Sequence, residues 1–163
     1  MSDILCIYYS RTGNTRKTMT EIAVALNAGV VEINDGVERR GLFGWLRSGV
    51  DAMSRTVPPI SAFKTEKALS EYRLVIVGTP VWAGRCSSVV RSFLKKHGRK
   101  LGPVAYVILR GSEDKNEEVF DQMDSFVENG HCAAVSLRRG SVGYVFWQEE
   151  FLRQIREYMA GRG

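Results

Sequence analysis

A chain of 163 residues with 44% hydrophobic and 25% charged residues is long enough to bury a core, and its composition is that of a globular protein. Its apolar runs are much shorter than a membrane span, and its four prolines exclude a collagen-like chain. We therefore expect a single domain over residues 1–163, with no membrane span.

The net charge of +5 and the isoelectric point near 9.3 raise the question of an acidic partner. A nucleic-acid-binding surface usually gathers its basic residues on one face, with aromatic residues between them. Here the basic residues are scattered in pairs such as Lys95-Lys96 and Arg138-Arg139. This pattern favours a solvated surface and no nucleic acid, with an anionic ligand or an acidic protein as the alternative.

The cysteines and the N-terminal residues bear on the compartment. Three cysteines without a C-x-x-C pair imply neither a disulfide framework nor a zinc site. Cys6 and Cys132 lie in apolar runs, as small core residues would. Cys86 follows Arg85 in a polar turn, where it is either a reactive thiol or a tolerated loop residue. The N-terminus lacks a basic leader and a cleavage site, so we expect a cytoplasmic protein.

Short apolar segments rich in β-branched residues indicate strands buried on both faces, as in a parallel sheet. In chain order they are Ile4–Tyr9, Val30–Ile33, Leu74–Val77, Val104–Leu109 and Ala133–Leu137, of which the second is short enough for an edge. Helical spacing of hydrophobic residues predicts helices over Thr15–Asn27, Ser87–His97, Glu117–Val127 and Trp147–Met159. The alternation predicts an open α/β sheet with helices on both faces.

The connection over residues 36–60 is long for a link between two strands. Within it, Gly41–Ser54 has an amphipathic helical pattern weakened by three glycines. This segment is either the helix of an ordinary crossover or part of a flap over a ligand, to which Phe43 and Trp45 would contribute apolar contacts.

The turn after the first predicted strand has the composition of an anion-binding loop. Its residues are Ser10, Arg11, Thr12, Gly13, Asn14 and Thr15. Its hydroxyls donate hydrogen bonds, its glycine allows a sharp turn, and Asn14 or Thr15 can cap a helix whose first N–H groups attract phosphate. The loop matches neither a Walker motif nor a dinucleotide fingerprint. A tyrosine phosphatase would need its cysteine inside this loop, whereas Cys6 lies in the strand.

This turn resembles the FMN-phosphate loop of flavodoxins, which has the pattern T/S-x-T/S-G-N/T-T/S after an N-terminal strand. A second flavodoxin-like stretch, Tyr72–Leu94, follows at the third strand. The resemblance implies bound FMN and a three-layer fold with five parallel strands in the order 2-1-3-4-5. It also implies that a turn after the third strand lies along the flavin ring. The residues of this turn are Pro80, Val81, Trp82, Ala83 and Gly84.

Within that turn, the resemblance places Trp82 against the ring and the Ala83-Gly84 peptide at the flavin N5. A tryptophan at a loop tip would otherwise expose a large apolar ring, so a planar cofactor gives it a role. The alternative is that Trp82 folds back into a local core.

The turn after the fourth strand departs from the flavodoxin pattern. Flavodoxins that carry electrons often have a tyrosine and acidic residues there, whereas this chain has Arg110, Gly111 and Ser112. Gly111 and Ser112 still offer backbone N–H groups to the pyrimidine edge of the flavin. Arg85 and Arg110 would favour the negative charge of a reduced flavin. An open, electropositive flavin site favours an oxidoreductase with a quinone or nicotinamide partner.

Other roles remain open alongside that interpretation. One is a soluble electron carrier that serves a redox partner protein, and another is a flavodoxin-fold binding or regulatory module without catalysis. A flavodoxin-like protoporphyrinogen oxidase would need a long insertion near the fifth strand, for which Ser136–Phe146 is too short. A receiver-type regulator would need aspartates at strand ends, and Asp3 lies at the wrong end of its strand. We expect no metal site and no catalytic acid, base or nucleophile, and the oligomeric state stays open.

Overall fold

The structure, a computed structural model, describes residues 2–36, 46–50 and 59–162. Its described strands form one sheet in which five parallel strands lie in the order β2-β1-β3-β5-β6. Their bounds are β1 Ile4–Tyr8, β2 Gly29–Glu32, β3 Leu74–Trp82, β5 Val104–Leu109 and β6 His131–Leu137. The predicted order of the parallel strands is therefore confirmed. A short strand that was not predicted, β4 (Arg85–Cys86), pairs antiparallel with the end of β3.

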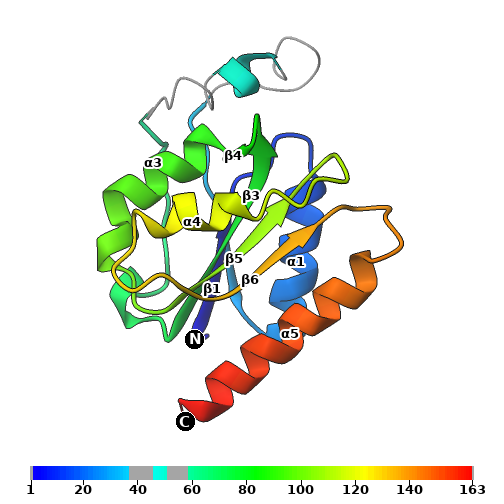
Figure 1. The fold of residues 1–163 in the computed structure, drawn as a ribbon. Helices are drawn as coiled ribbons and strands as arrows, with labels where there is room; N and C mark the ends of the chain where they lie inside the picture. Colours follow the sequence, from blue (N-terminus) through cyan, green and yellow to red (C-terminus); the bar gives the residue numbers. More distant parts are fainter. Residues whose placement is uncertain (1, 37–45, 51–58, 163) are drawn as a thin grey trace.

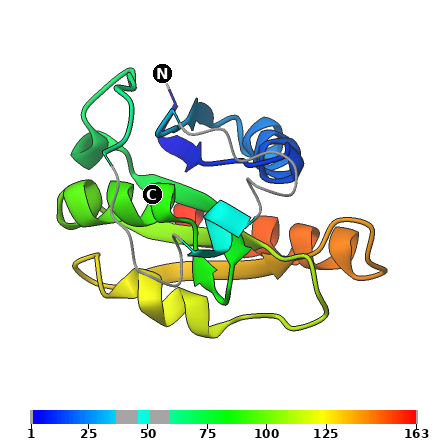
Figure 2. The same ribbon diagram turned by 90° about the horizontal axis from the view of Figure 1, so that it is seen from above.

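Helices cover both faces of the sheet, as Figure 1 and the view from above in Figure 2 show. The bounds are α1 Asn14–Leu26, α3 Ser88–His97, α4 Glu118–Asp124 and α5 Tyr144–Gly161, with single 3-10 turns η1 at Leu69–Glu71 and η2 at Gly98–Lys100. The predicted helices are confirmed in place, although α4 ends earlier than expected and α5 begins earlier.

Two cores lie on either side of the sheet because successive strand residues point to opposite faces. Under α1 and α5, Cys6 of β1 packs with Met19 and Phe151. Under α3 and α4, Ile7 of the same strand packs with a separate cluster that includes Phe93. Strands β1 and β5 are buried at every position, which explains their continuous apolar sequence.

The chain leaves the central strands in opposite directions. From β1 it passes to β2 at one edge, and from β3 it passes to β5 and then β6 toward the other edge. In doubly wound sheets, ligands bind at this reversal, outside the carboxyl ends of the strands. The fold thus directs attention to the turns that follow β1, β3, β5 and β6.

Strand β3 continues well beyond its predicted end at Val77 and reaches Trp82. Ala83 and Gly84 then reverse the chain with φ angles of 49° and 73°. Two residues with positive φ give the tight turn that suits a twisted hairpin. The expectation that Trp82 stands at a loop tip is therefore wrong, because it is the last residue of a strand.

Two expectations about cysteines also change. Cys6 is a core residue of β1, as expected, but Cys132 is exposed near the start of the edge strand β6. Cys86 is buried within the core cluster below α3 and α4. Burial raises the pKa of its thiol to about 11, so the hypothesis of a reactive Cys86 is wrong.

The long connection is described only at residues 46–50, which are helical, as expected for part of Gly41–Ser54. The rest of that predicted helix, with Phe43 and Trp45, lies outside the described residues. No helix in the described part of the chain combines the length and apolar character that a membrane crossing needs.

Candidate functional site at the carboxyl edge of the sheet

A cavity of about 670 Å³ opens at the carboxyl ends of the strands. Small-molecule and cofactor sites commonly have volumes of about 300–1,000 Å³. Most of the predicted site residues line it, and these are Ser10, Arg11, Thr12, Asn14, Thr15, Pro80, Val81, Trp82, Ala83, Arg110 and Gly111. The fold therefore brings together turns that lie far apart in the sequence.

Gly13, Gly84 and Ser112 belong to these turns but are not part of the lining. Gly13 is instead required by the backbone, since its φ of 107° is unfavourable for other residues. The carbonyl of Gly84 accepts a hydrogen bond of 3.3 Å from Gln122 of α4, and the carbonyl of Ser112 accepts one of 2.6 Å from Arg110. These residues hold the turns in shape.

The turn between β1 and α1 is closed by Ser10. Its Oγ accepts hydrogen bonds from the N–H groups of Gly13, at 3.0 Å, and Arg16, at 3.2 Å. Gly13 is the N-cap of α1, so the expectation that Asn14 or Thr15 caps this helix is wrong. The N–H groups of Asn14 and Thr15 have no acceptor within the helix and carry the positive end of its dipole. This geometry suits an anion beside the turn.

The hairpin of β3 and β4 is fixed by Thr79, which is fully buried. Its Oγ1 accepts a hydrogen bond of 2.9 Å from the N–H of Ser87 and donates one of 2.9 Å to the carbonyl of Pro80. Ser87 in turn caps α3 by accepting from the N–H of Val90 at 3.1 Å. The hairpin is thus tied to the start of α3.

Trp82 lies between the core and the cavity. Only 6% of it is exposed, and its ring packs edge-to-face on Tyr9 with a centroid distance of 5.5 Å. It also contributes to the cavity lining. The ring therefore packs into a local core, as the second hypothesis proposed. It also borders the cavity, as contact with a planar ligand would require.

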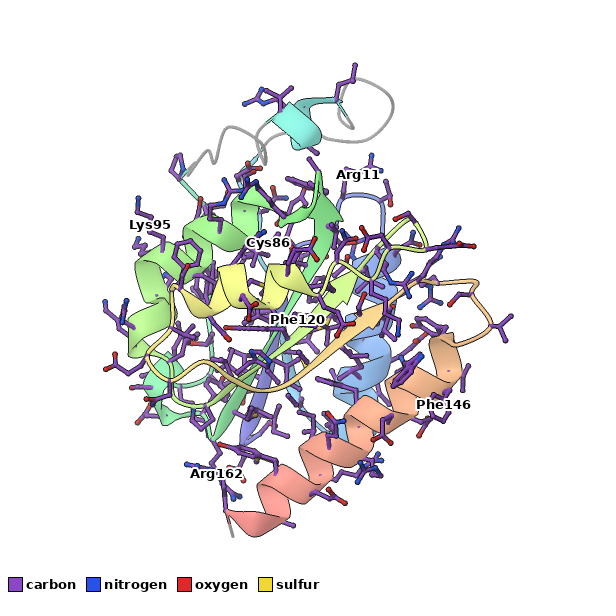
Figure 3. The ribbon with its side chains drawn as sticks, viewed as in Figure 1. Arg11, Cys86, Lys95, Phe120, Phe146 and Arg162 are labelled. Atoms are coloured by element: carbon purple, nitrogen blue, oxygen red, sulfur yellow. The ribbon has the colours of Figure 1, made fainter. Side chains whose placement is uncertain are left out.

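Four arginines line the cavity, namely Arg11, Arg110, Arg138 and Arg139, and the described lining contains no carboxylate. The interpretation of the basic residues as merely scattered is therefore wrong at this edge of the sheet. In Figure 3, Arg11 lies beside the turn from β1 to α1, at the same end as the hairpin. Arg85, expected near the flavin, lies on β4 and is not part of the lining.

Arg110 and Arg139 are anchored by hydrogen bonds from their side chains. Arg110 donates from Nε to Ser136 Oγ at 2.9 Å and from a terminal nitrogen to the carbonyl of Ser112. Arg139 donates to Glu21 at 3.2 Å and to the hydroxyl of Tyr144 at 2.7 Å. Arg110 thus connects the turn that follows β5 with strand β6. Arg139 connects the end of β6 with helices α1 and α5.

Glu21 is the centre of that second cluster. Burial raises the pKa of its carboxyl, but hydrogen bonds from Tyr144, Gln148 and Arg139 outweigh burial, so its pKa lies below the ordinary value. The carboxylate is therefore charged at neutral pH and compensates Arg139. Thr18 of α1 completes the cluster with a hydrogen bond of 2.7 Å to the Tyr144 hydroxyl.

The sequence did not reveal several lining residues, namely Leu46, Gly49, Val50, Leu109, Arg138 and Arg139. Arg138 and Arg139 directly follow the last strand, so the rule that ligands bind at carboxyl ends could have found them. Leu46 and Val50 come from the long connection, and both are exposed. Their place in the lining agrees with the hypothesis that this connection passes over a ligand. Among the described residues, no cluster of three or more His, Cys, Asp or Glu could hold a metal ion.

Solved structures of flavoproteins share this fold. The chain is similar to a flavoprotein from Lactobacillus acidophilus in complex with FMN, with a TM-score of 0.67, 17% identity, and coverage of 90% of this chain and 99% of that one. It is also similar to a flavoprotein from Bacteroides uniformis, with a TM-score of 0.71, 19% identity, and coverage of 95% of this chain and 98% of that one. A third similar structure is the apo form of an NADH:FMN oxidoreductase, EmoB, with a TM-score of 0.55, 12% identity, and coverage of 97% of this chain and 88% of that one.

No protein-family model and no curated protein matches the sequence. At the identities of the solved structures, the likeness establishes the fold alone. Together with the strand order, it confirms the predicted flavodoxin-like fold.

Proposed function

We propose that this protein binds FMN without a covalent bond and passes electrons through it. The observation that carries this proposal is that the β1–α1 turn and the β3–β4 hairpin line the same cavity. Arginines also line this cavity, and its described lining contains no carboxylate. FMN combines a phosphate dianion with a flat, largely apolar ring, and the cavity offers a different set of groups for each part.

The residues of the β1–α1 turn fit the phosphate. Thr12 and Thr15 bring hydroxyls, the start of α1 brings N–H groups, and Arg11 brings a positive charge. An anion at a helix start is favoured by the dipole and by the unpaired N–H groups together. Ser10 supports this site mainly by shaping the turn, because its oxygen already accepts two backbone hydrogen bonds.

The residues of the hairpin and of β5 fit the ring. Val81, Trp82 and Leu109 supply apolar surface in the lining. Ala83 and Gly84 form a tight turn, and the carbonyl of Gly84 accepts a hydrogen bond from Gln122. When bound, FMN would supply the electron-transfer chemistry, while these residues would orient its ring and shield one side from water. The similar flavoprotein from Lactobacillus acidophilus was solved with FMN, which supports the proposal.

Within this function we favour an oxidoreductase with a small quinone or nicotinamide as partner. The cavity is bordered by arginines that would favour a reduced, anionic flavin. The similarity to an NADH:FMN oxidoreductase supports the same choice. A cytoplasmic location remains a prediction from the N-terminal sequence.

An electron carrier for a partner protein is the second candidate. Val145 and Phe146, in the first turn of α5, are 66% and 64% exposed. Figure 3 shows Phe146 pointing outward from α5. Exposed apolar residues are common where proteins dock. Anaerobic titration of the FMN-loaded protein with NADH and NADPH, followed by a quinone, separates the candidates, since a carrier would accept electrons from neither nicotinamide.

Titration of the flavin-free protein with FMN tests the proposal itself. We expect flavin fluorescence and visible absorption to change saturably, and riboflavin, which lacks the phosphate, to bind much more weakly. Absence of any saturable change would refute FMN binding and favour a regulatory module without catalysis. Equal affinity for FMN and riboflavin would contradict the role assigned to the β1–α1 turn.

A further inference from the structure

A second hollow of about 280 Å³ adjoins the main cavity. The two spaces share Arg110 and Arg138, and the second extends toward the start of α5, where Tyr144 and Trp147 line it. None of the residues of the β1–α1 turn lines this hollow. The groups that we assign to the FMN phosphate are therefore separate from it.

The charge of the hollow is not balanced by its surroundings. Among the described residues, the half-buried Arg138 has no side-chain partner, in contrast to Arg139 with its bond to Glu21. Arg110 donates to neutral oxygens, which leave its positive charge uncompensated. Glu113 is the carboxylate of the lining, but it is exposed and forms no ion pair with either arginine. Two guanidinium groups without counterions favour an anionic ligand.

The hollow also has an aromatic wall. The ring of Trp147 is 42% exposed and lies against Gly143, where an added Cβ would approach the ring to 3.1 Å. A side chain at position 143 would require the ring to shift by a few tenths of an ångström, so the glycine allows the close approach of the ring. Lys115 lies 5.1 Å from the centre of the ring and adds a further positive charge. A flat apolar surface beside two arginines suits an aromatic acid.

We infer that this hollow binds the carboxylate or phosphate of an aromatic co-substrate and so holds its ring system beside the main cavity. This inference rests on the proposed function, because it assigns the small partner of the flavin to the class of aromatic anions. Arg138 contacts the acidic group, Arg110 adds charge while it keeps its bond to Ser136, and Trp147 packs against the ring.

Isothermal titration calorimetry on the full chain, with and without FMN, tests the inference. The probes are 2-naphthoate and 2-naphthyl phosphate, with 2-naphthol as a neutral control of similar shape. We expect one acid to bind roughly tenfold more tightly than 2-naphthol, since a hydrogen bond to a charged group is worth at least this factor. The acid that binds more tightly identifies the preferred group as carboxylate or phosphate.

Variants assign the effect to the hollow. Arg138→Gln should weaken binding of the preferred acid about tenfold and leave 2-naphthol unchanged. Arg99→Gln removes the same charge from η2, at the other end of the sheet. This control variant should leave the affinities for the acid and for 2-naphthol unchanged. Trp147→Leu should weaken both probes, because both pack against its ring. Equal affinities for acid and 2-naphthol, or no loss in Arg138→Gln, would overturn the inference.

Competition with FMN gives a further decisive outcome. If FMN expels the acid, the arginines serve the flavin itself, and the inference is wrong. If the protein fails to bind FMN but holds the acid through Arg138, the anion site stands and the proposed function falls. If FMN binds and neither acid does, the proposed function stands and the inference falls.

Discussion

The two ends of the sheet treat their charged residues differently. At the amino end, basic residues lie near acidic ones: Arg73 is 3.5 Å from Asp3, and Arg99 is 3.9 Å from Glu128. At the carboxyl end, Arg138 has no side-chain partner among the described residues, and Arg110 has only neutral ones. The carboxyl edge therefore presents two guanidinium groups without a carboxylate partner beside the cavity, although Arg139 at the same edge is paired with Glu21.

Two glycines at opposite ends of the sheet differ in how closely their surroundings are packed. At the amino end, a Cβ on Gly98 would overlap the carbonyl oxygen of Phe126 and lie 3.0 Å from its carbon. At the carboxyl end, a Cβ on Gly111 would meet nothing within 4 Å. At these two positions, the backbone around Gly98 is closely packed, whereas the turn after β5 leaves open space beside the cavity.

The largest expected effect is that of Gly98→Ala. A backbone carbonyl cannot move aside cheaply, so we expect a loss of about 3 kcal/mol in the free energy of unfolding. Gly111→Ala, the matched change at the cavity end, should stay within about 0.5 kcal/mol of the original protein. Urea unfolding followed by circular dichroism measures both. Similar losses in the two variants would show that the ends are packed alike.

A second prediction concerns the hydroxyls of the β1–α1 turn. Thr12→Ala with Thr15→Ala removes two donors to the FMN phosphate, and we expect the dissociation constant of FMN to rise about 100-fold. Thr20→Ala, which removes an exposed hydroxyl from the same helix outside the cavity, is the control. Fluorescence titration gives the constants, and urea unfolding verifies that the sheet remains folded. Unchanged affinity in the double variant would refute the assignment of the turn.

That turn was predictable because its chemistry is local. Its composition is continuous in the sequence, and it follows β1, whose complete burial gives an unmistakable apolar run. The same reason explains why β5 was predicted with its observed bounds. The pattern could not predict that Ser10 closes the turn while Gly13 caps α1, because this depends on the backbone angles.

The hairpin was missed for two physical reasons. Pro80 lies within β3, and a proline usually argues against the continuation of a strand. Ala83 has a positive φ, whereas turn prediction expects glycine or asparagine at such a position. Arg11 and Arg110 were predicted as site residues, but Arg138 and Arg139 were missed, because a sequence lists charges without placing them in space. Arg110 meets Ser136, which is distant in the sequence and adjacent in space.

A smaller effect is expected for Glu21, which gives Arg139 the carboxylate that Arg138 lacks. Glu21→Gln should cost about 1 kcal/mol or less at pH 7, because the Glu21 side chain is 44% exposed and such pairs are weakened by solvent. Glu149→Gln, an exposed change on α5, should cost nothing measurable. If Glu21→Gln were as harmless as Glu149→Gln, the cluster would have no role in stability.

The pH dependence of the Glu21 effect has a defined sign. Since the pKa of this carboxyl is lowered in the folded protein, its contribution is present above the ordinary value of 4.5 and is lost as the pH falls through the lower folded value. The difference in unfolding free energy between the original protein and Glu21→Gln should therefore shrink below pH 4.5. A difference that stays constant to low pH would contradict the assigned charge.

The smallest expected effect concerns the reactivity of the three cysteines. Here the exposed residue lies at the amino end of the sheet. Cys132, near the amino end of β6, is exposed, whereas Cys86 in the hairpin and Cys6 in β1 are buried. Burial raises the pKa of the Cys86 thiol to about 11 and that of the Cys6 thiol to about 12. Both thiols therefore stay protonated and unreactive at pH 8.

We expect a disulfide reagent such as 5,5′-dithiobis(2-nitrobenzoate) to label Cys132 rapidly at pH 8 and the other two cysteines only after unfolding in guanidinium. Partial burial also raises the pKa of the Cys132 thiol, which slows its reaction but does not block access. Cys132→Ser should abolish the rapid phase. Rapid labelling that persists in Cys132→Ser would mean that the hairpin opens and exposes Cys86, so the cavity edge would be less firmly held than the bonds of Thr79 and Gln122 indicate.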